Sequence, residues 1–97
     1  MKIEVLILTD NEKHWRDRIH NEVNIRKSIR THCQTRLNSE LFDFLIMSSL
    51  PYNYKGKRFA AIIIDKPVDQ KIYSVLLTSG IVKGKVIHTE NYYEEMG

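Results

Sequence analysis

Three short runs of consecutive apolar residues constrain the fold of this chain more than any other feature. They cover residues 5–8, 44–47 and 60–64, and they are rich in the branched and aromatic residues that favour β-strands. A strand that meets water on one face alternates apolar and polar residues, whereas a strand covered on both faces need not. We therefore expect a sheet whose second face is also covered, either by helices on both sides or by another molecule.

A helix is expected directly after the first run. Thr9 and Glu12 have the spacing of a capping box, which predicts a helix start. In helical projection, one arc collects the apolar positions Trp15, Ile19, Val23, Ile25, Ile29, Cys33 and Leu37. This favours one helix over residues 12–37. Two alternatives stay open: a helix that breaks near residues 21–24, and a helix followed by an alternating strand over residues 23–33.

Two further strands are predicted at residues 42–48 and 59–65. The segment between them is shorter than the dozen or more residues that a parallel crossover usually needs, so an antiparallel pair is favoured.

The last third of the chain predicts one helix and one strand. Asp69 is placed to cap a helix over residues 70–79, and Gly80 is a usual helix terminator. Residues 85–89 form the last predicted strand, unless Lys83 and Gly84 turn a small hairpin instead.

The predicted order of elements is βαββαβ. It favours a ferredoxin-like α/β (α+β) fold, a four-stranded sheet with two helices on one face. The alternative is a small doubly wound, Rossmann-like three-layer sheet. With 97 residues the chain can bury one core, so we expect a single domain over residues 1–97.

Composition points to a cytoplasmic protein. Cys33 is the only cysteine, which excludes an intramolecular disulfide and fits a reducing compartment. The apolar runs are too short for a membrane span or a signal peptide, so no membrane partner is expected. Residues with AT-rich codons (Ile, Lys, Asn, Tyr, Phe) clearly outnumber those with GC-rich codons (Gly, Ala, Arg, Pro), which is typical of a low-GC bacterium or its phage.

Asp10 and Asp65 each follow an apolar run, where open α/β sheets gather binding groups. Two carboxylates at such a position can hold Mg²⁺. This pair resembles the acidic pocket of receiver domains and of metal-dependent Rossmann-like nucleases, which implies phosphotransfer or nuclease chemistry. No third acid with the expected spacing is evident, and strand-end Asp residues commonly cap helices or form turns, so a cofactor is not expected.

Basic charge is concentrated between residues 13 and 36. The seven basic residues there are Lys13, Arg16, Arg18, Arg26, Lys27, Arg30 and Arg36, against the two acids Asp17 and Glu22. A basic helix can neutralise nucleic-acid phosphate, meet an acidic protein surface or only be solvated. The loop that follows residue 50 adds groups suited to the same partners, namely Tyr52, Tyr54, Lys57 and Arg58.

No histidine stands beside a serine or cysteine nucleophile in a recognised motif, and neither a paired metal-ligand spacing of histidines nor a phosphate-binding glycine loop is evident in the sequence. We therefore expect a small noncatalytic binding or regulatory protein that acts by protein–protein interaction and forms a homodimer through its apolar sheet face. Its size and residue usage suit a phage or mobile-element inhibitor or accessory protein. The first alternative is a nucleic-acid-binding module that uses the basic helix 13–36, and the second is a metal-dependent phosphotransfer or nuclease enzyme.

Overall fold

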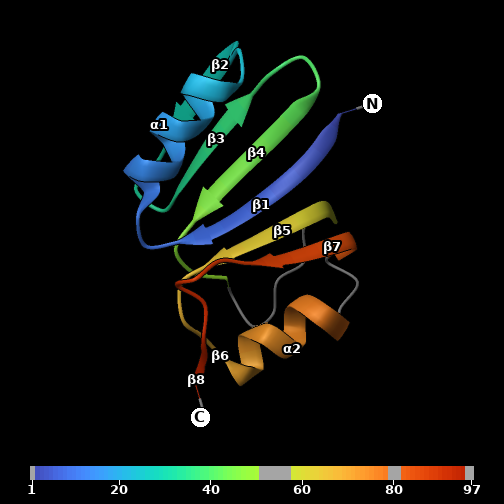
Figure 1. Cartoon of the computed structure of the whole chain (residues 1–97). Helices are drawn as coiled ribbons and strands as arrows, with labels where there is room; N and C mark the ends of the chain where they lie inside the picture. Colours follow the sequence, from blue (N-terminus) through green and yellow to red (C-terminus); the bar gives the residue numbers. More distant parts are fainter. Residues whose placement is uncertain (1, 51–57, 79–81, 96–97) are drawn as a thin grey trace.

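A computed structural model of the chain describes residues 2–50, 58–78 and 82–95 (Figure 1). Six strands form one mixed sheet in the spatial order β2, β3, β4, β1, β5, β7. Their bounds are β1 Ile3–Thr9, β2 Lys27–Arg30, β3 Gln34–Asn38, β4 Phe42–Met47, β5 Phe59–Asp65 and β7 Val82–His88. The helices are α1 Glu12–Glu22 and α2 Gln70–Thr78, and a small parallel pair joins β6 Val68–Asp69 to β8 Glu94–Glu95.

The α/β class is confirmed, but the four-stranded ferredoxin-like arrangement does not match. Strand β1 lies at the centre and pairs in parallel with both β4 and β5, while β7 extends the parallel part beyond β5. The predicted antiparallel pairing of residues 42–48 with 59–65 is therefore wrong. That prediction assumed that neighbours in sequence are neighbours in the sheet. Strand β1 takes the central place because its apolar side chains can be buried on both faces.

The two helices cover opposite faces of the sheet. Along β1, Leu6 and Leu8 belong to one apolar cluster, which includes Leu76 of α2. The alternate residues Val5 and Ile7 belong to a second cluster, which includes Trp15 of α1. Figure 1 shows α1 beside β3 and β4, and α2 beyond β5 and β7. The two helices are placed on opposite faces, as in the doubly wound alternative. Because both faces are covered, the strands are apolar on consecutive residues.

The single helix predicted over residues 12–37 is wrong. Helix α1 ends at Glu22, and Val23 follows with an extended backbone (φ −130°, ψ 138°). The chain then forms the antiparallel hairpin of β2 and β3, whose turn is held by the Thr31 hydroxyl accepting from the backbone N–H of Gln34. Trp15 and Leu37 do share one cluster, as a helical arc would require, but they reach it from a helix and a strand.

The predicted helix and strand near the C-terminus agree well with the structure. Asp69 accepts a hydrogen bond from the backbone N–H of Ile72 (2.8 Å), so it caps α2 as expected. Strand β7 pairs in parallel with β5. At Gly84 the two strands approach so closely that a Cβ has no room beside the carbonyl oxygen of Ala60. Neither helix in the described part of the chain combines the length and apolar character that crossing a bilayer requires.

Candidate functional site

The carboxyl ends of β1 and β5 form the natural binding edge of this sheet. Strand β1 leads into α1 on one face, and β5 leads through β6 into α2 on the other. Open α/β sheets bind ligands at such a switch point. The register places Thr9 of β1 beside Asp65 of β5 at this edge. Two hollows open here, one of about 670 Å³ on the α1 side and one of about 490 Å³ on the α2 side.

Asp65 is the centre of a polar network on the α1 side. Its side chain is buried, at 9% exposure. One carboxylate oxygen accepts from the hydroxyl of Thr9 (2.9 Å) and the indole Nε1 of Trp15 (2.5 Å). The other oxygen accepts from the hydroxyl of Thr89 (2.6 Å) and the amide Nδ2 of Asn91 (3.0 Å). Asp65 therefore ties together β1, α1 and the segment that follows β7.

These donors determine the charge of Asp65. Burial acts to raise the pKa of its carboxyl group, because it disfavours the charged form. The hydrogen bonds from Thr89, Trp15, Asn91 and Thr9 outweigh burial, so the pKa lies below its ordinary value. Asp65 is therefore ionised at neutral pH, and its four donors compensate the buried charge.

Asp10 has a different environment at the same edge. Its side chain is 65% exposed, and one carboxylate oxygen accepts from the Nζ of Lys66 at 2.9 Å. Lys66 Nζ also donates to the backbone carbonyl of Ser48, so it links the ends of β1, β4 and β5. Lys66 is not among the site residues predicted from the sequence. The sequence does show that Lys66 directly follows the strand-end residue Asp65. From that position a lysine side chain can reach across the edge of the sheet.

The structure thus brings the strand ends of the predicted metal site together, but it gives both carboxylates protein partners. A cation at Asp65 would have to displace hydrogen-bond donors, and one at Asp10 would compete with Lys66. Within residues 2–50, 58–78 and 82–95, no three His, Cys, Asp or Glu side chains are grouped so that they could hold a metal ion. The Asp10–Asp65 metal site stays a prediction that these contacts do not favour.

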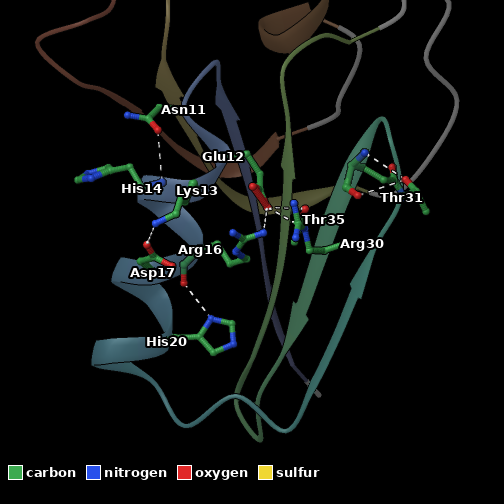
Figure 2. A network of polar contacts seen from close by, with 11 residues as sticks. Asn11, Glu12, Lys13, His14, Arg16, Asp17, His20, Arg30, Thr31 and Thr35 are labelled. Carbon is green, nitrogen blue, oxygen red and sulfur yellow. Dashed lines mark hydrogen bonds and ion pairs between the residues drawn. The ribbon is translucent and has the colours of Figure 1, made fainter.

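The predicted basic segment is divided between α1, β2 and β3, and much of its charge is paired. Glu12 Oε1 accepts from Arg16 (3.0 Å) and from the hydroxyl of Thr35 (2.9 Å), and it also lies 3.5 Å from Nε of Arg30 (Figure 2). Further ion pairs are Lys13–Asp17, Arg18–Glu22 and Arg26–Glu40. No continuous basic helix exists over residues 13–36, and acids within the segment and on either side of it partly neutralise its charge.

The remaining predicted contact residues are dispersed. Lys27 and Arg36 are exposed on β2 and β3, and Arg58 is exposed just before β5. Tyr52, Tyr54 and Lys57 lie outside the described residues.

The α1 side of the sheet carries a partly exposed apolar strip. On the α1 side of the sheet, one row of paired residues runs from β4 to β7 through Ile46, Ile7, Ile63 and Ile87. Ile46 and Ile7 are buried under α1, Ile63 is only partly buried, and Ile87 is 39% exposed. We call Ala61, Ile63 and Ile87 the β5–β7 strip. The position of this strip beside α1 depends on the strand order, which the sequence did not reveal.

Comparison with known proteins adds no relative. No protein-family model, no curated protein and no solved structure matches this chain. What the molecule binds must therefore be inferred from the geometry of its own residues.

Proposed function

We propose that this protein is a small noncatalytic binding protein that acts by docking onto another protein. The observation that carries the proposal is the β5–β7 strip. Helix α1 has 11 residues and packs over β4, so it leaves the neighbouring part of the same sheet face without a covering helix in the described structure (Figure 1). Exposed apolar groups rimmed by polar residues are typical of protein interaction surfaces.

The polar groups at the sheet edge support a binding role over catalysis. An acid or base that takes part in a reaction must be able to reach a substrate proton or metal ion. Asp65 is instead held by four donors from the protein, and Asp10 is held by Lys66. Asp65 connects β1, α1 and the segment after β7, and the Asp10–Lys66 pair connects strand ends, so both carboxylates hold parts of the fold together.

A different protein is favoured as the partner over a second copy. The expectation of a homodimer started from a sheet with one bare face, whereas α1 and α2 lie on opposite faces. The area left for self-association is accordingly smaller, and the homodimer stays a prediction. A role as a phage or mobile-element inhibitor or accessory protein suits the chain's size and AT-rich residue usage.

Affinity capture tests this proposal. The tagged 97-residue chain is incubated with nuclease-treated lysate of the source organism, in parallel with its Ile87→Asp and Leu77→Asp variants. Leu77 is 50% exposed on α2, on the other face of the sheet, so it is a matched surface control. We expect the wild type and Leu77→Asp to retain one partner protein, and Ile87→Asp to lose it. The proposal would be refuted if the wild type retains nothing. It would also be refuted if the wild type retains only nucleic acid from a lysate that was not treated with nuclease.

A further inference from the structure

The β5–β7 strip continues into the large hollow at the carboxyl edge. Ile63 and Ile87 are paired neighbours, and two residues further along the chain lie Asp65, at the end of β5, and Thr89, directly after β7, which line the hollow. Side chains two positions apart on a strand point to the same face. The strip therefore borders the hollow of about 670 Å³ on the α1 side, and we call the strip and the hollow together the groove.

Helix α1 and the segment after β7 form the two sides of this groove. His14, Trp15 and Arg18 line it from α1, while Asn91 and Tyr93 line it from the C-terminal segment. The Arg18 guanidinium lies 5.3 Å from the ring centre of Trp15. Tyr93 is 62% exposed, so its ring is available at the rim. The groove thus combines an apolar floor with aromatic and basic walls, as protein-binding surfaces commonly do.

Charge along β7 and beyond it defines what the groove can accept. Lys85 is exposed next to the strip, and Glu90 is exposed beside the hollow. Neither side chain has an ion-pair partner among the residues that the structure describes. A bound segment with an acid near Lys85 and a base near Glu90 would complement both charges.

We infer that this groove binds an amphipathic helix of a protein partner. The helix would lie beside α1, with an apolar stripe on Ile63 and Ile87, an acidic residue facing Lys85 and a basic residue facing Glu90. Amphipathic helices bind such grooves through apolar residues three and four positions apart. Helices that pack side by side are about 8–10 Å apart, so a partner helix over β5 and β7 would extend the layer that α1 begins. This inference rests on the proposed function and names the kind of partner.

A second copy of this chain does not supply such a helix from its described residues. Every exposed residue of α1 is polar, including Lys13, Asp17 and His20. The exposed side of α2 carries Gln70, Lys71, Ser74 and Leu77, of which only Leu77 is apolar. Neither helix presents an apolar stripe, so placing either one on the strip would bury polar groups without partners.

A selection with helical peptides tests the inference. The probe is a displayed library of peptides on a stable helical scaffold with a randomised exposed face, and the bait is the immobilised full chain. We expect enriched peptides to share an apolar stripe flanked by an acid and a base. Their affinity should fall at least tenfold for Ile87→Asp and remain unchanged for Leu77→Asp. Lys85→Glu, at an exposed position, should lower the affinity of peptides whose acid faces Lys85 and select peptides with a base there instead.

Two outcomes overturn the inference. One is a selection that enriches no peptide, or only peptides that bind the wild type, Ile87→Asp and Lys85→Glu equally well. The other is a wild-type dimer in sedimentation that Ile87→Asp converts to a folded monomer, because a second copy would then occupy the groove. If the wild type, Ile87→Asp and Lys85→Glu capture a partner protein from lysate equally well, the proposed function stands, but this groove is not the site that binds the partner.

Discussion

The indole nitrogen of Trp15 donates a 2.5 Å hydrogen bond to the carboxylate of Asp65, fifty residues further along the chain. This bond joins α1 to the end of β5 beneath the large hollow, where Thr9 and Thr89 donate to the same carboxylate. A buried carboxylate with four donors is worth more to stability than an exposed ion pair, because each donor would lose its partner if the charge were removed.

Replacing the carboxylate of Asp65 should therefore destabilise the fold. In Asp65→Asn, an amide NH₂ would face donors that now point at an oxygen, and we expect unfolding to become easier by about 2–4 kcal/mol. Urea denaturation followed by circular dichroism measures the change. Asp10→Asn is the control, and it should cost less than about 1 kcal/mol because Asp10 is exposed. Equal effects of the two variants would contradict the central role of Asp65.

The lowered pKa of Asp65 predicts how stability changes with pH. Its folded pKa lies below the unfolded value of about 3.9, so its contribution is complete above that value and is lost as pH falls through the folded pKa. We expect the free energy of unfolding to decline as pH falls below about 4, and Asp65→Asn to flatten this decline. Asp17 also has a lowered pKa, chiefly through its hydrogen bond from Lys13, so Asp17→Asn is measured beside it. If the free energy of unfolding of Asp65→Asn declines with pH as steeply as that of the wild type, groups other than Asp65 cause the acid sensitivity.

Divalent cations should leave thermal stability unchanged. A ligand that binds only the folded state raises Tm by mass action. Because both carboxylates are occupied by protein donors, we expect no rise in Tm with Mg²⁺ or Mn²⁺ at millimolar concentrations, as differential scanning fluorimetry would show. A rise that disappears in Asp65→Asn would instead establish the metal site and revive the enzyme hypothesis.

Gly84 should not tolerate a side chain. A Cβ at this position would overlap the carbonyl oxygen of Ala60 on the neighbouring strand, so β7 would have to move away from β5. We expect Gly84→Ala to cost about 1–3 kcal/mol in chemical denaturation, the usual range for overpacking. Ala60→Gly removes a methyl group on the partner strand without touching this oxygen, and it should not rescue the Gly84→Ala variant.

Nucleic-acid binding should be weak and entirely electrostatic. The basic residues of the segment 13–36 are spread over α1, β2, β3 and the connection before β2, and several are paired with acids. Fluorescence anisotropy with labelled single- and double-stranded DNA should detect binding only at low salt, if at all, and replacing Arg26, Lys27 and Arg30 by Ala should flatten the salt dependence. Tight binding that persists at physiological salt would favour the nucleic-acid module over a protein-docking role.

Local interactions made several features predictable from the sequence. The apolar runs identified β1, β4 and β5, because a buried strand needs little more than consecutive branched residues. Asp69 identified the start of α2, because a cap acts on backbone groups only three residues away. The same apolar runs correctly required that both sheet faces be covered.

Strand order, in contrast, was decided by tertiary packing. Trp15, Ile19 and Leu37 fit one helical arc, yet the second half of that segment forms a hairpin of β2 and β3, and β3 pairs in turn with β4. The four donors to Asp65 come from residues up to 56 positions away, and Lys66 reaches Asp10 across the same separation. The pairing of Ile63 with Ile87 likewise depends on β7 joining β5. Sequence patterns report which side chains avoid water, whereas the sheet order decides which of them meet and which stay exposed.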